Sequence, residues 1–303
     1  MSSNRSVINR VLVAVMLSAD ILSAVSGQAQ TNATTSAASE TIQVPASGEA
    51  VMFKTSFDLG EIFLLKASGT ATVGGATFDA GHENSGADVV AGTDVGVDTG
   101  LKNLRIPEGV VPGRLKWFSG HRDDHTYYLL ATGNGQPLTL KLVTGEKHGG
   151  LGAIHVSLFR LSSEPILPAP LETLQIPVLE QTNQTVMTTS NGVIYLLRCT
   201  GEAKVGGNGL GLGDAEYMDY QADGSGQEDI GDANTDYGLG VDEADQSKTP
   251  RQHWWGPWRK DHTYYQLYAG TGQPIHFFYY DVKGGYGDNS RTDRLTINLF
   301  PVP

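Results

Sequence analysis

An internal repeat is the feature that most constrains the fold of this chain. The segment Asp-His-Thr-Tyr-Tyr at residues 124–128 returns unchanged at 261–265, and Gly-x-Gly-Gln-Pro follows in both copies. Three further pairs keep the same order: 41–45 with 173–177, 63–69 with 195–201, and 156–159 with 297–300. The spacing between copies grows from 132 to 137 and then to 141 residues. A unit of about 130 residues is much longer than a solenoid repeat of about 20–50 residues, so it predicts two domains.

Each unit has the sequence pattern of a β-sandwich. Short β-branched and aromatic runs alternate with Gly, Pro, Asn and Asp, and no segment keeps an apolar period of 3.6 residues. We therefore expect an all-β fold of two tandem antiparallel β-sandwiches, jelly-roll-like, at residues 41–161 and 171–303, joined by a Pro-rich linker at 162–170. The Gly-rich segments 73–100 and 205–246 are long for sandwich connections, and are either functional loops or detours with short strands.

The N-terminal residues 1–29 are predicted to be a signal peptide. Two arginines precede an apolar stretch, and small residues surround position 29. Asp20 interrupts the apolar stretch, so a membrane-inserted anchor is not expected. Residues 30–40 are rich in Thr, Ser and Ala and are expected to form a flexible leader. The chain is thus expected to be secreted or periplasmic, and its single cysteine, Cys199, fits a buried strand position better than a reactive thiol.

The charge balance excludes some classes of partner. The chain has 33 acidic and 21 basic side chains, a formal net charge of −12, whereas nucleic-acid binding needs an excess of Lys and Arg. Nucleic acids and anionic membranes are therefore not expected as partners, while an oligomer remains open. Eleven acidic residues and no Lys or Arg lie at 214–245. This stretch matches no EF-hand pattern, and binding of further calcium, a solvated insertion and a pair of glycosidase carboxylates all remain open.

The last difference between the copies creates an acidic, Gly-rich loop. Residues 281–289 read Asp-Val-Lys-Gly-Gly-Tyr-Gly-Asp-Asn, whereas the first copy has Thr144 opposite Asp281 and is four residues shorter here. Carboxylate and amide oxygens on a backbone that can wrap around one ion suit Ca²⁺, and suit the stricter octahedral geometry of Mg²⁺ less well. Asp, Gly and Asn are also ordinary turn residues before a strand. The residues alone leave both interpretations open.

This loop resembles the calcium loop of the PA-IL (LecA-type) galactose-binding lectins. Residues 280–290 and the alternating strand at 295–299 are similar to that family's calcium loop and closing strand, and residues 200–206 resemble an early segment of the family. The resemblance implies a β-sandwich that binds one Ca²⁺ together with two adjacent hydroxyls of a terminal galactose. The implied calcium ligands are the side chains of Asp281, Asp288 and Asn289 and the main-chain carbonyls of Val205 and Gly285. The implied sugar contacts are Asp281, Val282, Gly285 and Asp288, with Tyr220 and Gln221.

The sequence thus predicts a secreted, non-enzymatic lectin that binds galactose-type glycans through Ca²⁺ in the second unit, with the first unit a degenerate copy. One alternative is a calcium-stabilised structural or adhesion module. Another is a secreted carbohydrate-active hydrolase that uses carboxylates of residues 214–245.

Two further motifs are interpreted structurally. The repeated Asp-His occurs in both copies, so we expect a shared structural role at a strand start rather than acid–base catalysis. Residues 253–258 include three tryptophans and are expected to pack in a core rather than form an aromatic platform for a sugar.

Overall fold

Antiparallel strands make up most of the described chain. The fold is taken from a computed structural model that describes residues 38–85, 88–90, 97–99, 117–144, 149–161, 167–206, 211–219, 238–242, 255–281 and 285–303. Within these ranges the regular structure is β-strand except for one 3-10 helix, η2 (Gly285–Asp288). The predicted all-β class is confirmed. The predicted signal peptide and most of the predicted leader lie outside the described residues, among which no helix is long and apolar enough to cross a membrane.

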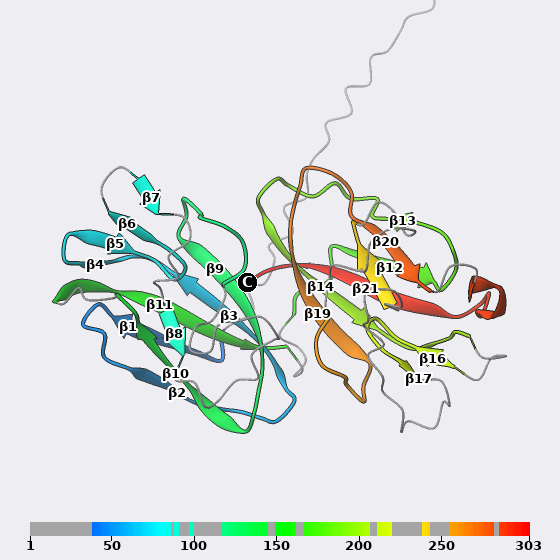
Figure 1. Ribbon diagram of the computed structural model, residues 1–303, viewed down its shortest axis with the longest axis horizontal. Coiled ribbons are helices and arrows are strands. Elements are labelled where there is room, and N and C mark those ends of the chain that lie inside the picture. The colour runs from blue at the N-terminus through cyan, green and yellow to red at the C-terminus, as the bar shows by residue number, and fades with distance from the viewer. Residues whose placement is uncertain are drawn as a thin grey trace, which may run out of the picture. The chain divides into compact units, whose positions relative to one another are not determined.

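The first repeat forms two sheets that share one core (Figure 1). The larger sheet has the order β7-β6-β5-β4-β11-β3-β9, and β1 also pairs with β11; the smaller sheet has the order β2-β10-β8. Phe53 of the smaller sheet and Leu65 of the larger one lie fully buried in the same hydrophobic cluster, as expected of a β-sandwich. The strands are β1 (Glu40–Pro45), β2 (Val51–Phe57), β3 (Ile62–Ser68), β4 (Ala71–Val73), β5 (Ala76–Phe78), β6 (Glu83–Ser85), β7 (Asp88–Val90), β8 (Val97–Thr99), β9 (Thr126–Thr132), β10 (Gln136–Leu142) and β11 (Gly150–Arg160).

The second repeat has the same strand order in its principal sheet. Its order β12-β21-β14-β19 corresponds to β1-β11-β3-β9, and smaller sheets are formed by β13-β20-β18 and β15-β16-β17. Among the described strands, none of one repeat pairs with one of the other. The strands are β12 (Glu172–Pro177), β13 (Asn183–Gln184), β14 (Ile194–Thr200), β15 (Ala203–Lys204), β16 (Leu212–Gly213), β17 (Met218–Asp219), β18 (Gly238–Val241), β19 (Thr263–Ala269), β20 (His276–Tyr280) and β21 (Arg294–Pro301).

The repeat extends to single hydrogen bonds. The carboxylate of Glu40, at the start of β1, accepts the backbone N–H groups of Lys54 (2.9 Å) and Thr55 (2.8 Å). In the second repeat, Glu172 at the start of β12 accepts those of Val186 (2.8 Å) and Met187 (2.9 Å). Because the same contacts recur, the aligned segments are equivalent in structure as well as in sequence.

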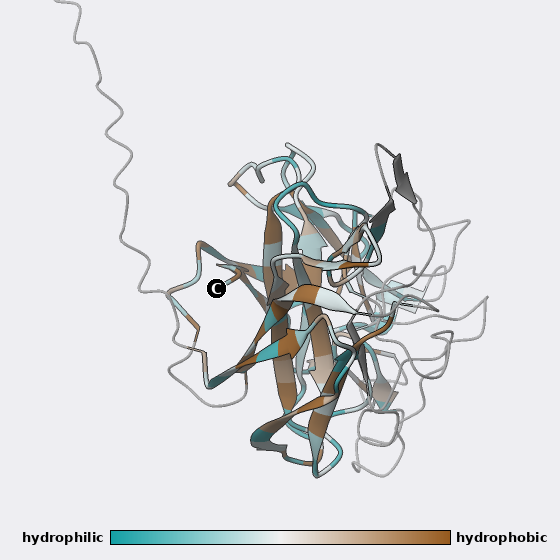
Figure 2. Cartoon of the chain, turned by 90° about the vertical axis from the view of Figure 1, so that its left-hand side faces the viewer, coloured by the Kyte–Doolittle hydropathy of each residue, from teal (hydrophilic) through white to brown (hydrophobic). Residues whose placement is uncertain are grey.

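Strands β3 and β14 are buried on both faces, which explains their nearly continuous apolar sequences. One face of each strand lies in the core of its own repeat, and Figure 2 shows such hydrophobic residues along the strands and hydrophilic residues in the turns. The other faces, with Leu64 and Leu196, contribute to a third cluster made of equivalent residues from both repeats. The Tyr265 hydroxyl donates to the Leu161 carbonyl (3.0 Å) in this cluster, and all described residues belong to one compact unit, Thr34–Pro303.

Candidate functional site

The loop before β21 folds back against β15. The Ser290 N–H donates to the Lys204 carbonyl (2.9 Å), which brings the loop alongside the segment that follows β15. Asn289 is almost fully buried, with 6% of its surface exposed, and is held on both sides of its amide. Its Oδ1 accepts the N–H of Gly206 (3.1 Å), and its Nδ2 donates to the Val178 carbonyl (2.7 Å). The two segments that the sequence predicts to share an ion therefore lie side by side.

Asp281 follows β20 and contacts the start of η2. A Cβ placed on Gly285 would come 2.7 Å from Asp281 Oδ1, closer than real Cβ atoms approach, so glycine lets the carboxylate reach the backbone. On the other side, the Tyr286 hydroxyl accepts the Asp281 N–H (3.2 Å) and donates to the Tyr279 carbonyl (2.9 Å). Burial raises the pKa of Tyr286 to about 12, so the phenol stays protonated and able to donate. Tyr286 thus has a structural role in this loop.

The predicted calcium ligands meet in two places, one at the start of η2 and one directly after its end. Asp281 lies against Gly285 at the start of η2, and Asn289, directly after η2, binds the residue that follows Val205. Asp288 is exposed at the end of η2. The donor atoms are carboxylate, amide and carbonyl oxygens, which are the ligands that Ca²⁺ prefers, so the residues present fit this ion. Three predicted sugar contacts lie outside the described residues: Val282, Tyr220 and Gln221.

A second constellation surrounds a buried carboxylate at the turn before β19. Asp214 is 2% exposed and accepts four hydrogen bonds. His262 has φ of 44°, a conformation that costs energy for residues other than glycine, and its Nε2 lies 2.9 Å from Glu202 Oε1. The hydrogen bond to Asp214 raises the pKa of His262 although burial opposes it, whereas burial and the Asp214 charge raise the pKa of Tyr264. The four donors are Glu216 N (2.8 Å), Tyr217 N (2.7 Å), His262 Nδ1 (2.8 Å) and the Tyr264 hydroxyl (2.7 Å).

The first repeat contains the same network around Asp79, which is 3% exposed. His125 also has a positive φ, of 47°, and burial raises the pKa of Tyr127 well above its ordinary value. The repeated Asp-His-Thr-Tyr-Tyr therefore has the shared structural role that the sequence predicts. The four donors to Asp79 are Gly81 N (2.9 Å), His82 N (2.7 Å), His125 Nδ1 (2.9 Å) and the Tyr127 hydroxyl (2.9 Å).

The carboxylate that binds each histidine is not the aspartate of the repeated motif. Asp124 instead pairs with Arg122 (2.8 Å) and accepts the Thr126 N–H (3.0 Å). The partners of the histidines, Asp79 and Asp214, lie 46 and 48 residues earlier in the chain. Sequence reasoning missed both, although an Asp-Ala pair recurs at the two positions.

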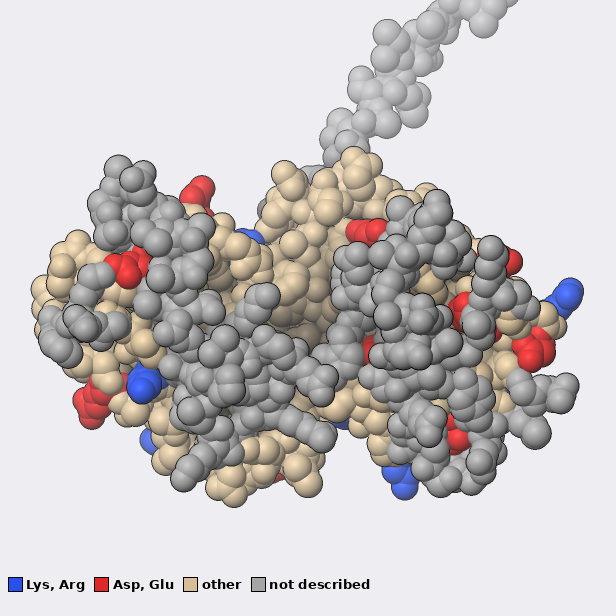
Figure 3. Space-filling model, in the orientation of Figure 1, with Lys and Arg blue, Asp and Glu red and all other residues tan. Residues whose placement is uncertain are grey.

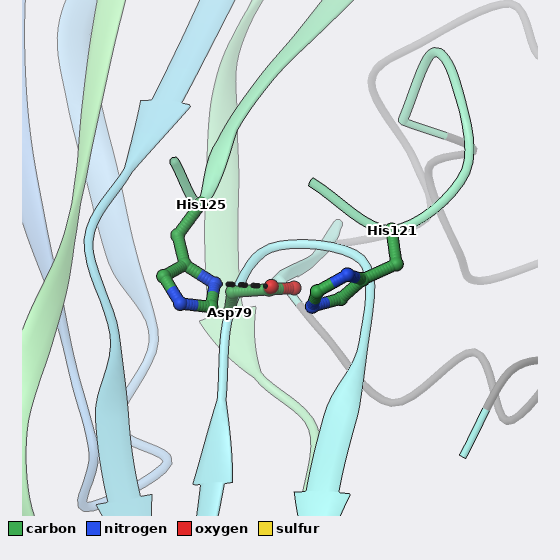
Figure 4. A group of neighbouring side chains, drawn as sticks. All are labelled: Asp79, His121 and His125. Atoms are coloured by element: carbon green, nitrogen blue, oxygen red, sulfur yellow. Dashed lines mark hydrogen bonds and ion pairs between the residues drawn. The ribbon is translucent and has the colours of Figure 1, made fainter. Parts of the chain in front are cut away.

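Two histidines around Asp79 have no counterpart in the second repeat. Three residues after the carboxylate the first repeat has His82 where the second has Tyr217, and four residues before the shared histidine it has His121 where the second has Trp258. Figure 4 shows the Asp79 carboxylate between the imidazoles of His125 and His121. One ligand atom from each of these three residues lies within 4.8 Å of the other two, so this group has the composition and spacing of a candidate metal centre.

Several residues of the acidic stretch at 214–245 belong to the fold. Glu216 is buried and accepts the backbone N–H of Trp255 (2.8 Å), which is 3% exposed and packs in the core of the second repeat. Asp242 accepts the His276 N–H (2.8 Å) and the Tyr268 hydroxyl. A wholly solvated insertion is therefore wrong for these acids, and the core interpretation is confirmed for Trp255. On the face in Figure 3, described acidic side chains lie at separate points rather than in one patch.

Cys199 is fully buried in β14, as predicted, and burial raises the pKa of its thiol well above the ordinary value. Seven of the eleven carboxylates at 214–245, the stretch that the hydrolase alternative would use, lie outside the described residues. No protein-family model, curated protein or solved structure matches the chain.

Proposed function

We propose that the second repeat is a calcium-dependent carbohydrate-binding module that recognises galactose-type sugars through the loop before β21. The observation that supports this proposal is the contact between Asn289 Oδ1 and the Gly206 N–H (3.1 Å). It joins two segments more than 80 residues apart in sequence at the place where the resemblance to PA-IL lectins requires both. Ordinary turn chemistry before a strand does not require this contact.

The orientation of Asn289 favours an oxygen ligand. Its Nδ2 is committed to the buried Val178 carbonyl (2.7 Å), so its Oδ1 faces the segment at 205–206. An amide oxygen has two lone pairs, and the Gly206 N–H uses one of them. The second remains for an ion bound together with the carboxylate of Asp281.

The donor set leaves room for a sugar. Ca²⁺ binds six to eight oxygens at about 2.3–2.6 Å. Asp281, Asp288, Asn289 and the carbonyls of Val205 and Gly285 would supply five, and the bound ion would attract vicinal hydroxyls to the remaining positions. The two carboxylates balance the charge of the ion and can accept hydrogen bonds from the same hydroxyls. A neutral, hydroxyl-rich ligand therefore fits better than an anionic one.

Export, which we propose from residues 1–29, would place this loop in a compartment where weak calcium sites fill. Gly285 offers no side chain to a sugar, so a calcium-stabilised adhesion or structural module is the second candidate function. In that case the bound ion would hold η2 close to β15, and no sugar would bind at its remaining coordination positions.

Calorimetry of the chelator-treated full chain tests both candidates. We expect heat on titration with CaCl₂, and further heat when galactose is added in excess Ca²⁺. A control sugar whose adjacent hydroxyls are arranged differently from those of galactose should give no further heat. Asp281→Asn should abolish the calcium heat. Asp293→Asn is the matched control, because Asp293 lies beside the same loop but accepts the Lys204 N–H (3.1 Å) instead.

Each outcome separates the candidates. The absence of calcium heat in the wild-type chain would overturn both. Calcium heat without galactose heat would overturn the lectin and support the structural module. Equal calcium binding by Asp281→Asn and the wild type would show that the ion binds elsewhere.

A further inference from the structure

Three imidazoles of the first repeat converge on one buried carboxylate. His125 Nδ1 lies 2.9 Å and His82 Nδ1 3.7 Å from the carboxylate oxygens of Asp79. The ring of His121 has its centroid 5.5 Å from that of His82 and 5.9 Å from that of His125. Three of the eight histidines of the chain thus surround a single side chain that is 3% exposed.

The second repeat provides an internal reference for what the fold requires at this place. Its Trp258 and His262 rings are 6.4 Å apart, which matches the His121–His125 pair. The rings of Tyr217 and Tyr264 are 6.3 Å apart, as against 5.5 Å for the first repeat's pair of His82 with its tyrosine. The network around Asp214 is thus built with a Tyr and a Trp at these two positions. The structural role explains the shared Asp, His and Tyr, and His82 Nδ1 forms a hydrogen bond with the Tyr127 hydroxyl (3.1 Å), but this role does not explain His121.

We propose that the first repeat binds a Zn²⁺ ion through Asp79, His121 and His125. Imidazole nitrogen with one carboxylate is a donor set that suits Zn²⁺ and its transition-metal neighbours, and not Ca²⁺ or Mg²⁺. Ligand atoms of a tetrahedral Zn²⁺ site lie about 2.0–2.2 Å from the ion. The three ligand atoms, within 4.8 Å of one another, must therefore move closer to the ion. The imidazoles are 27% and 35% exposed at His121 and His125, which leaves them room to turn.

The surrounding hydrogen bonds orient the carboxylate for this role. Gly81 N–H, His82 N–H and the Tyr127 hydroxyl donate to Asp79, and such outer contacts commonly fix metal ligands in place. Zn²⁺ would replace the hydrogen bond between His125 and Asp79, and His125 would bind as the neutral imidazole tautomer that carries its proton on the ring nitrogen facing away from the ion. The fourth position would be open to water or to the neighbouring imidazole.

The test uses the chelator-treated full chain in saturating CaCl₂, so that all-oxygen sites are filled before Zn²⁺ is added. Calorimetry with ZnCl₂ should show one tight site, and CoCl₂ should give the visible absorption of a tetrahedral imidazole site. The main variant is His121→Trp, which installs the residue that the second repeat carries at this position. A second variant, His121→Gln, keeps the test valid if the first fails to fold. His276→Gln is the matched control, since His276 Nδ1 also faces a carboxylate, Asp242, at 3.6 Å.

We expect affinity for Zn²⁺ to fall by more than about tenfold in the folded His121 variants, because loss of an outer hydrogen-bond partner of a metal ligand already costs about that much, and to stay unchanged in His276→Gln. The cobalt absorption should disappear with it. The absence of zinc heat in the wild type would overturn the proposal. So would unchanged zinc affinity in folded His121 variants, or an equal loss in His276→Gln.

Discussion

Replacement of Asp214 should destabilise the chain far more than replacement of Asp261, the aspartate that adjoins His262 in sequence. Asp214→Ala removes the acceptor of four hydrogen bonds at a position that is 2% exposed. Asp261→Ala removes a carboxylate whose side chain is 55% exposed and pairs with Arg259 at 3.0 Å. Both variants replace an aspartate by alanine. Asp214 lies 48 residues before His262 in the sequence, whereas Asp261 lies one residue before it.

The size of the expected stability loss follows from the hydrogen-bond donors that each substitution leaves without an acceptor. Loss of Asp214 leaves the Tyr264 hydroxyl and two backbone N–H groups buried without an acceptor, at about 1–3 kcal/mol each, while His262 can regain water. Removal of the buried charge offsets part of this cost, so we expect a net loss of about 3–5 kcal/mol in the free energy of unfolding. An exposed pair such as Asp261–Arg259 contributes about 0–1 kcal/mol.

Urea unfolding followed by tryptophan fluorescence measures the difference. With a slope of about 2 kcal/mol per molar urea, Asp214→Ala should lower the midpoint by about 1.5–2.5 M, and Asp261→Ala by less than about 0.5 M. Asp79→Ala and Asp124→Ala repeat the comparison in the first repeat. Equal shifts for the two variants of either repeat would refute the assignment of the buried aspartate as the partner of the histidine.

Three other predictions follow from the second repeat and its core. The hydrogen bond to Asp214 raises the pKa of His262 in the folded chain above 6.5. The stabilisation from this bond is therefore complete below pH 6.5 and is lost as the pH rises through the raised pKa. The difference in urea midpoint between the wild type and Asp214→Asn should shrink over this window, and a constant difference would contradict this prediction. Cys199 should react with a thiol reagent only after unfolding, because burial raises its pKa and excludes the reagent; rapid labelling of the native chain would show otherwise. Gly213→Ala would place a Cβ 2.2 Å from a buried tyrosine hydroxyl and should cost about 1–3 kcal/mol, whereas Gly120→Ala meets nothing within 4 Å and should be nearly neutral in thermal unfolding.

The strands were predictable because their signal is local. In β14, Ile194 to Leu197 form an apolar run whose burial follows directly from residue type, and the same run at Ile62 to Leu65 in β3 identifies its equivalent. The loop before β21 was identifiable because acidic and glycine residues stand together where one copy exceeds the other. Such features need only neighbouring residues or a comparison between the copies.

The network around the buried aspartates was not predictable in the same way. Asp79 and Asp214 lie in long Gly-rich segments, and each meets its histidine only when strands distant in sequence pair. The repeated motif contains an aspartate that is nearer to the histidine in sequence, Asp124. In the folded chain this carboxylate pairs with Arg122 instead. His82 lies in the same turn as Asp79, but His121 comes from a separate segment, so its approach to that carboxylate depends on tertiary structure.

The bond between each buried aspartate and its histidine also closes a long loop of chain. It holds residues 46 apart in the first repeat and 48 apart in the second, and the sequences between these ends differ widely. Once the ends are held, doubling the length of a flexible connection costs only about 0.6 kcal/mol. These stretches also contain sheet strands, among them β8 in the first repeat and β18 in the second. Foreign segments can therefore be inserted between β8 and Trp117, or between β18 and Trp255, while the sheets keep their hydrogen bonds, which makes each repeat a scaffold for engineering new recognition loops.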